Sequence, residues 1–321
     1  MCCGRPARSR AGIPSLHSRQ ALPVRGSETP APRPHRMTFS KTFTHSQVAG
    51  EGDAPRQLVW PPLNIAHRGA SGEAPENTLA AFELALRQGA KAIELDVHLS
   101  SDGVPMVIHD PRLRRTTSGS GWVREHRANV LRRLDAGSWF NRRFPEKARQ
   151  RYAGAKIPLL AEALAWVRQH AMLALVEIKR GRETYPGIEA KVLDEIERAG
   201  MRRLVTIVSF DLGALRRVRE LDSRISLGLD ISRSLLALRR VRSLASTIVL
   251  PHWAIASRRF IRRAHRHSIR VFPWAVDQPA RMKRKLADGV DGIVTNYPAR
   301  LAEFLRRRES GFRSQESGGR S

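Results

Sequence analysis

Glu94 and Asp96 are two residues apart in the run AIELDVH (residues 92–98), whose alternating apolar and polar pattern is typical of a β-strand. Successive side chains of a strand point to opposite faces, so the two carboxylates share one face. Two neighbouring carboxylates repel each other unless water solvates them, one is protonated, or a hard divalent cation lies between them. The pair is therefore a candidate ligand set for Mg²⁺ or Ca²⁺.

A predicted hairpin adds an imidazole to this acidic pair. The dipeptide Asp102-Gly103, flanked by apolar residues, favours a two-residue type I′ turn. Counting outward from that turn pairs Asp96 with His109. His109 is therefore expected across from the carboxylates, where it could transfer protons.

Polar residues also end two other predicted strands. His67 and Arg68 follow a short apolar run, and Glu177 and Lys179 share one face at the end of the apolar run 173–178. Each of these pairs alone would be an ordinary surface pair. Together with the acidic pair they form a set in which Glu177 completes an oxygen-rich cage, while Arg68 and Lys179 meet phosphate oxygens.

The elements that position these groups alternate between short apolar strands and amphipathic helices. Besides strands near Ile65 and Ile93, the pattern predicts strands at residues 173–178, 204–209, 225–230, 247–250, 270–276 and 292–295. Eight strand–helix repeats, with the return strand of the hairpin left out, predict an α/β fold of the TIM (β/α)8 barrel type, whose sites lie at the carboxyl ends of the strands. A doubly wound sheet is the alternative, but the chain has no glycine-rich phosphate loop after the first strand. At the end of the seventh strand, Trp274 could cover the organic part of a substrate or pack in the core.

The barrel is expected to span residues 58–308. Residues 111–156 are too many for an ordinary connection, so we expect a small inserted subdomain after the hairpin of the second strand. The first helix is predicted over residues 78–88, with Asn77 as its N-cap. Residues 1–57 are basic and rich in Pro, Ser and Gly, which predicts a disordered tail, and translation starting at Met37 would remove most of it. Residues 309–321 are expected to be a disordered C-terminal tail.

The composition limits the classes of function. The chain has 321 residues, a formal net charge of +27 and a pI near 11.6, so it should attract phosphate-bearing solutes and, weakly, anionic surfaces. Cys2 and Cys3 both lie in the N-terminal tail; the fold therefore needs no disulfide, and a cytoplasmic location is expected. The sequence has no 18-residue apolar segment, which argues against a membrane span. The positive charge also leaves open a nucleic-acid-binding barrel, but the chain has no recognised nucleic-acid-binding motif.

Four short motifs in the chain resemble those of the glycerophosphodiester phosphodiesterases. These motifs are His67-Arg68-Gly69, Pro75-Glu76-Asn77-Thr78, Glu94-Leu95-Asp96-Val97 and His109-Asp110. The resemblance covers roughly residues 60–305. An aspartate often stands in that family where this chain has Asn296, so we assign no role to Asn296.

The resemblance implies metal-dependent hydrolysis of a small glycerophosphodiester to sn-glycerol 3-phosphate and an alcohol. The implied site residues are the metal ligands Glu94, Asp96 and Glu177, the acid/base histidines His67 and His109, and the phosphate contacts Arg68 and Lys179. Trp274 is a further candidate substrate contact because of its position. Water or a neighbouring hydroxyl of the substrate could be the nucleophile. Lysophospholipase D-type cleavage is an alternative, but it would favour an apolar insertion, and this insertion is polar and basic.

Overall fold

The computed structural model of the protein describes residues 62–180, 185–232 and 237–317. The expected N-terminal tail, with Met37 and both cysteines, lies outside the described residues. In chain order the elements are β1 (Leu63–His67), α1 (Leu79–Arg87), β2 (Ala92–Leu99), β3 (Pro105–Val107), η1 (Leu113–Arg115), η2 (Val123–Glu125), α2 (Ala128–Leu131), α3 (Ser138–Arg143), η3 (Pro145–Lys147), η4 (Gln150–Tyr152), α4 (Leu160–Gln169), β4 (Leu173–Ile178), α5 (Ile188–Arg198), β5 (Val205–Ser209), α6 (Leu212–Leu221), β6 (Ser226–Ile231), α7 (Ala237–Ser243), β7 (Ile248–Pro251), α8 (Arg258–His265), β8 (Arg270–Val271), α9 (Pro279–Asp288), β9 (Gly292–Thr295) and α10 (Pro298–Ser317).

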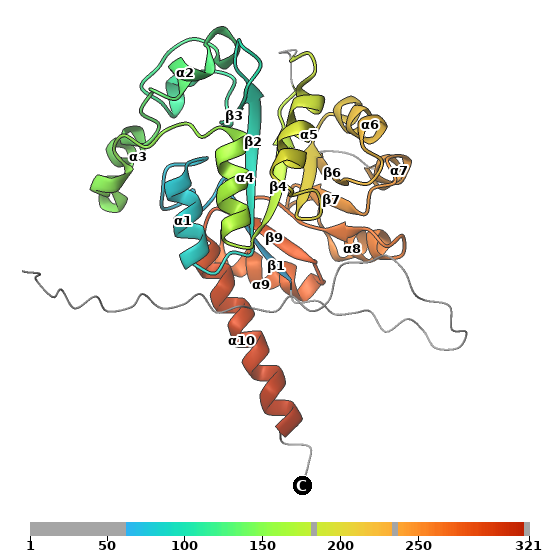
Figure 1. Cartoon of the computed structure of the whole chain (residues 1–321). Coiled ribbons are helices and arrows are strands. Elements are labelled where there is room, and N and C mark those ends of the chain that lie inside the picture. The colour runs from blue at the N-terminus through green and yellow to red at the C-terminus, as the bar shows by residue number, and fades with distance from the viewer. Residues whose placement is uncertain (1–61, 181–184, 233–236, 318–321) are drawn as a thin grey trace, which may run out of the picture. The chain divides into compact units, whose positions relative to one another are not determined.

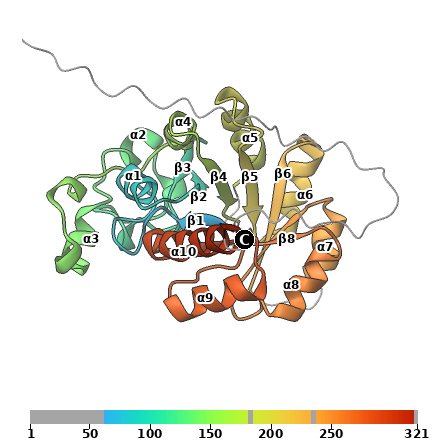
Figure 2. The ribbon, with the colours of Figure 1, turned by 90° about the horizontal axis from the view of Figure 1, so that it is seen from below.

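The strands form one sheet that curls into a barrel with helices around it (Figures 1 and 2). Eight of the described strands are parallel, in the order β8-β7-β6-β5-β4-β2-β1-β9, and β3 pairs antiparallel with β2 outside this path. Backbone hydrogen bonds close the gap between β8 and β9: Val294 N donates to the Pro273 carbonyl and Val276 N donates to the Val294 carbonyl, both at 3.0 Å. The predicted TIM (β/α)8 barrel with an inserted subdomain is confirmed.

Alternating strand residues build two apolar regions. Inward-facing side chains fill the barrel interior: Ile65, Ala92, Leu175, Val208, Ile248, Leu250, Phe272 and Val294. Side chains of the opposite face, such as Ile93 and Val176, pack against the helices in the larger core. Because the interior is filled with apolar groups, polar inward-facing residues are found where the strands end.

The hairpin register differs from our prediction by one residue. Asp96 lies opposite Ile108, whose amide donates to the Asp96 carbonyl (3.0 Å), and not opposite His109. The loop has three residues instead of two, because Gly103, with φ of 73°, donates its N–H to the carbonyl of Ser100 (2.9 Å). A turn followed by a left-handed residue is the usual geometry of such three-residue loops.

Helix α1 begins one residue later than predicted. Thr78 is the N-cap, since its hydroxyl accepts a hydrogen bond from the amide of Ala81 (3.3 Å). The prediction that Asn77 caps this helix was wrong. Asn77 instead has φ of 55°, a left-handed conformation that asparagine tolerates better than most residues, and its side chain serves the site described below.

The segment between β3 and α4 folds into short helices with their own apolar clusters, apart from the helices α5 to α9 in Figure 1. Phe140 and Tyr152 are buried there and meet edge to face, with ring centroids 5.8 Å apart. The Tyr152 hydroxyl donates to the carbonyl of Glu73 (3.1 Å), and Lys147 Nζ donates to the carbonyl of Gly72 (3.0 Å). These contacts fix the inserted segment to the loop that follows β1.

The C-terminal helix is longer than expected. Helix α10 continues to Ser317, so residues 309–317 are helical and not the disordered tail that we predicted. No helix among the described residues is long and apolar enough to cross a membrane.

Candidate active site

Three buried carboxylates lie on the inner face at the carboxyl ends of β2 and β4. Glu94 and Asp96 share one face of β2, and Glu177 pairs with Asp96 across the β2–β4 ladder. One oxygen from each carboxylate lies within 4.8 Å of the other two. The structure thus brings together the three acids selected from the sequence.

Two cations contact these carboxylates. Lys179 Nζ lies 2.9 Å from Asp96 Oδ1 and 2.7 Å from Glu177 Oε2, and Arg68 Nε lies 3.1 Å from Asp96 Oδ2. Burial alone would raise the pKa of Asp96, but Lys179 and Arg68 hold that pKa well below its usual range. Burial alone would lower the pKa of Lys179, but Asp96 and Glu177 raise it above its usual value. Asp96 and Lys179 therefore both stay charged.

Glu94 and Glu177 have too little positive charge nearby to offset the effect of burial on their pKa values. Burial, followed by the charges of Asp96 and Glu177, raises the pKa of Glu94 well above its usual range. Burial and the charge of Asp96 also raise the pKa of Glu177 to about 7, although Lys179 opposes the change. A divalent cation would stabilise the ionised forms of all three acids, and such an all-oxygen set suits Mg²⁺ or Ca²⁺. The donor set fits a hard divalent cation.

His67 ends β1 beside the carboxylates. Its Nε2 lies 3.9 Å from Glu94 Oε2, and its Nδ1 lies 2.7 Å from Asn296 Oδ1. Burial, followed by the charge of Arg68, lowers the pKa of His67 to about 4. At neutral pH the ring is therefore uncharged and has one nitrogen that can accept a proton.

His109 is held by residues from outside the barrel strands. Its Nδ1 lies 2.6 Å from Asp110 Oδ1. Arg115, in the inserted segment, donates from Nε to Asp110 (2.5 Å) and from both terminal nitrogens to Glu76 (2.7 Å each). Glu76 also accepts from Arg68 Nη1 (3.0 Å), so Asp110, Arg115 and Glu76 link His109 to Arg68.

Two residues that support the site were not among the site residues predicted from the sequence. Asn77 Nδ2 donates to Asp96 Oδ2 (2.7 Å). His98, buried in β2, binds the Tyr185 hydroxyl through Nδ1 (2.8 Å) and donates from Nε2 to the carbonyl of His109 (2.9 Å). Asn77 belongs to one of the family-like motifs and could have been found there, whereas no local sequence signal distinguishes His98.

The side of the barrel mouth formed by β5 to β8 carries aromatic residues. Trp274 meets Phe210 and His252 edge to face, each with ring centroids 5.4 Å apart, and its Nε1 donates to the Leu250 carbonyl (2.8 Å). Phe210 is 44% exposed. Asp230, at the end of β6, is buried, and its Oδ2 has no hydrogen-bond partner among the described residues. This side therefore offers a fixed indole face and one buried carboxyl group.

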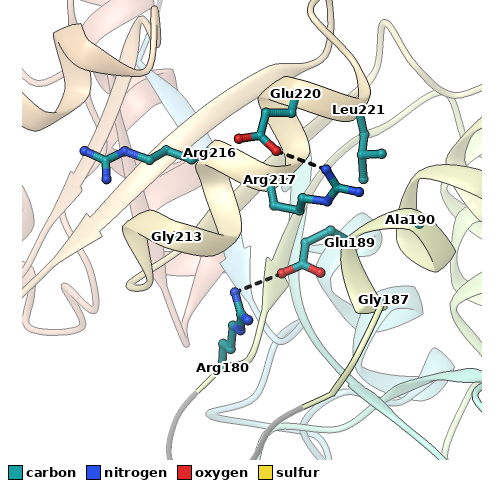
Figure 3. Close-up of a pocket in the computed structure, with 9 residues that line it drawn as sticks. All are labelled: Arg180, Gly187, Glu189, Ala190, Gly213, Arg216, Arg217, Glu220 and Leu221. Carbon is teal, nitrogen blue, oxygen red and sulfur yellow. Dashed lines mark hydrogen bonds and ion pairs between the residues drawn. The ribbon is translucent and has the colours of Figure 1, made fainter.

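A cavity of about 550 Å³ lies away from these residues, between α5 and α6 (Figure 3). Arg180, which follows Lys179 in the chain, lines it and lies 3.2 Å from Glu189. Arg217 lies 3.0 Å from Glu220. Because these two arginines have acidic partners and no predicted site residue lines the cavity, we assign no chemistry to it.

Acidic, basic and imidazole side chains that face one another at the carboxyl ends of barrel strands define a TIM-barrel enzyme. Residues 67–300 match the glycerophosphoryl diester phosphodiesterase family. The chain belongs to that family.

Individual relatives resemble the chain over most of its length. A glycerophosphodiester phosphodiesterase of Caldanaerobacter subterraneus is 36% identical over 76% of this chain and 98% of the relative. One from Bacillus subtilis is 35% identical over 74% and 84%, respectively. The structure of an Oleispira antarctica phosphodiesterase in complex with the product sn-glycerol-3-phosphate gives a TM-score of 0.67 at 29% identity, covering 76% of this chain and 96% of that one. The Agrobacterium tumefaciens glycerophosphodiester phosphodiesterase gives 0.64 at 30% identity, covering 74% and 98%.

Proposed function

We propose that the protein hydrolyses glycerophosphodiesters to sn-glycerol 3-phosphate and an alcohol, using a divalent metal ion bound by Glu94, Asp96 and Glu177. The observation that carries this proposal is the convergence of these three buried carboxylates with two cations against them. Family membership supports the substrate class. The similar Oleispira antarctica phosphodiesterase, whose structure contains sn-glycerol-3-phosphate, supports this compound as the product.

Arg68 and Lys179 are the proposed phosphate ligands. When bound, Mg²⁺ or Ca²⁺ would polarise a phosphate oxygen as a Lewis acid. Both side chains contact the carboxylates, so they can neutralise charge on the metal ligands and on a phosphate that lies against them. Trp274 is the proposed contact for the organic part of the substrate, because its ring is fixed at the mouth of the barrel.

His67 and His109 are the proposed acid/base pair. One ring removes a proton from the nucleophile as its oxygen bonds to phosphorus, and the other donates a proton to the leaving alkoxide as the P–O bond breaks. If the nucleophile is water, glycerol 3-phosphate forms directly. If it is a neighbouring hydroxyl of the substrate, a cyclic phosphate forms first, and ³¹P NMR of the reaction mixture distinguishes the two routes.

The metal requirement is tested first. Purified protein treated with excess chelator should lose activity on glycerophosphocholine and glycerophosphoethanolamine, and Mg²⁺ or Ca²⁺ should restore it. Glu94→Gln should lower kcat by at least about 10-fold to 10²-fold, the cost of losing only a partner of a metal ligand, because a ligand itself is lost. Glu83→Gln, on the exposed face of α1, is the matched control and should keep full activity.

Full activity in excess chelator contradicts the proposal. Turnover of lysophosphatidylcholine alone would favour the lysophospholipase D alternative.

The roles of the histidines are tested with leaving groups. His67→Ala and His109→Ala should each lower kcat on glycerophosphodiesters far more than they change KM, because proton transfer occurs only in the transition state. A p-nitrophenolate leaving group departs without protonation, so it should partly rescue the variant that lacks the general acid. If both variants keep near wild-type kcat, the histidines are structural.

A further inference from the structure

A chain of polar contacts reaches the distal nitrogen of His67 from the point where the barrel closes. Asn296 follows β9, and Asp277 follows β8. Asn296 Nδ2 lies 2.6 Å from Asp277 Oδ2, the Asn296 backbone N–H lies 2.9 Å from Asp277 Oδ1, and Asn296 Oδ1 lies 2.7 Å from His67 Nδ1. Ser71 Oγ also lies 2.7 Å from Asn296 Oδ1.

The chemistry of these groups fixes the direction of every hydrogen bond between them. An ionised carboxylate only accepts, so the side of the Asn296 amide that faces Asp277 must be the –NH₂ group. The amide oxygen therefore faces His67, and because that oxygen only accepts, Nδ1 of His67 must carry the hydrogen. Nε2 then has the free lone pair, and it is the nitrogen that lies 3.9 Å from Glu94.

We propose that Asp277 and Asn296 are positioning residues that hold His67 in the Nδ1–H tautomer, so that Nε2 faces the reacting phosphate as a proton acceptor or, once protonated, a donor. This inference deepens the proposed function and rests on it for its kinetic consequence. In the family, an aspartate often stands where this chain has Asn296. In this chain Asp277 provides a carboxylate instead. It orients the side-chain amide of Asn296, and that amide in turn orients the ring of His67.

Replacing Asp277 with asparagine should reverse the orientation of the whole chain of contacts. The new amide has only one oxygen, whereas the Asn296 backbone N–H and the Asn296 side-chain –NH₂ each need an acceptor. If that oxygen accepts from the Asn296 backbone N–H, the new –NH₂ faces the Asn296 side chain, which must turn its own oxygen toward it. The –NH₂ group of Asn296 then faces His67, Nδ1 must accept, and the ring hydrogen moves to Nε2.

The exchange of both residues should restore the original direction. In Asn296→Asp alone, two carboxylates lie against each other and repel, so one must take up a proton. In the double variant Asp277→Asn/Asn296→Asp, the new carboxylate at position 296 accepts from His67 Nδ1 and from the new amide at position 277. That amide keeps its oxygen for the backbone N–H. Every donor has an acceptor, and the Nδ1–H tautomer is preserved.

The experiment combines ¹⁵N NMR of histidine-labelled, metal-loaded protein at alkaline pH with steady-state kinetics. The His67 signals are identified by their absence in His67→Gln. We expect a protonated Nδ1 in the wild type, a shift of the hydrogen to Nε2 in Asp277→Asn, and a return to Nδ1–H in the double variant. In parallel, kcat on glycerophosphocholine should fall by about 10-fold to 10²-fold in Asp277→Asn with KM nearly unchanged. That fall is smaller than most of the ~10² to 10⁴ that complete loss of a proton transfer costs, and the double variant should recover most of it.

Asp291→Asn is the matched control. Asp291 lies at the opposite, amino end of β9, where its Oδ2 lies 2.8 Å from His265 Nε2 and accepts from the Val271 amide. This change removes a carboxylate that contacts a histidine outside the site, so it should lower thermal stability without changing kcat or the His67 signals. A difference in kcat between the two single variants therefore separates positioning from stability.

Three outcomes would overturn the proposal. The first is a wild-type His67 with its hydrogen on Nε2, which needs no variant to fold. The second is an Asp277→Asn variant that keeps both the tautomer and kcat, and the third is a folded double variant with no recovery. If the wild type shows Nδ1–H but hydrolyses no glycerophosphodiester, the proposed function fails while the tautomer assignment stands.

Discussion

Arg115 links the inserted segment to the catalytic candidate His109 through Asp110. Its guanidinium binds both oxygens of Glu76 and contacts Asp110, which in turn binds His109. A planar guanidinium can satisfy two carboxylates at once, whereas an ammonium group cannot reproduce that geometry. The orientation of His109 therefore depends on a residue outside the barrel strands.

Arg115→Lys should lower kcat by about 10-fold while the fold is kept, because positive charge remains but the two-sided contact is lost. Arg114→Lys, the exposed neighbour, provides the control for a change of arginine to lysine in the same turn. The measurement is kcat and KM on glycerophosphocholine for both variants. Equal kcat values would show that Arg115 does not orient His109.

His98 should make stability depend on pH. Burial lowers its pKa to about 4, below the ordinary value of 6.5, against the opposing effect of the His109 carbonyl. As pH falls, the unfolded chain takes up this proton near pH 6.5, whereas the folded protein does so only near pH 4. The stability that neutral His98 contributes is therefore complete above pH 6.5 and is lost between pH 6.5 and 4, by up to about 3 kcal/mol.

His98→Gln should remove this part of the pH dependence. Urea unfolding at fixed metal concentration gives the free energy of unfolding of both proteins at pH 7 and pH 5. The wild type should lose about 2 kcal/mol more than the variant between these values. Parallel losses in the two proteins would show that another group is responsible.

At the scale of elements, periodicity predicted most of the barrel but not the details of its connections. The strands β4 and β9 begin and end at the predicted residues, because apolar runs between helices leave little choice. The hairpin register was missed because Asp102-Gly103 suits a two-residue loop and a three-residue loop equally, and only the closing hydrogen bonds decide between them. A loop one residue longer moves every opposing residue along the strand by one position.

The polar network around the histidines could not be predicted for a different reason. Carboxylates and histidines at strand ends are visible in the sequence, because strand alternation and the barrel rule place them together. The partner of the distal nitrogen of His67 is far away in the chain: Asn296 is 229 residues from His67. No spacing rule connects residues so far apart, and the departure from the family pattern gave no reason to assign Asn296 a role.

Gly137 should determine whether the inserted segment can dock. A Cβ at this position would lie 1.7 Å from the carbonyl oxygen of Tyr152, so Gly137→Ala must displace the backbone around Tyr152. We expect a loss of about 1 to 3 kcal/mol, as for other overpacked sites, and faster proteolysis within residues 138–155. Gly200→Ala is the control. A Cβ at this position would meet nothing within 4 Å, so the substitution has only the conformational cost of placing alanine at a positive φ. Equal thermal shifts for both variants would contradict this prediction.

At the scale of the whole molecule, the formal charge of +27 should act on the rate of substrate capture. A net charge of this size accelerates the approach of anions, and salt screens the effect over about 10 Å at 0.1 M. Added NaCl should therefore lower kcat/KM for glycerophosphoglycerol, which carries a net negative charge, more than for zwitterionic glycerophosphocholine. The value of kcat should stay constant for both substrates. Identical salt dependence for the two would show that the charge does not steer substrates.

The closure of the barrel between β8 and β9 has a consequence for heat inactivation. Isolated backbone hydrogen bonds and the side chain of Asp277 join the two edges there, whereas continuous ladders join the other neighbouring strands of the barrel path. Regions with few hydrogen bonds open at lower free energy than the rest of a fold. Warming should therefore separate Asp277 from Asn296 and release His67 while most of the barrel is still folded, so that turnover fails several degrees before the far-ultraviolet circular dichroism signal is lost.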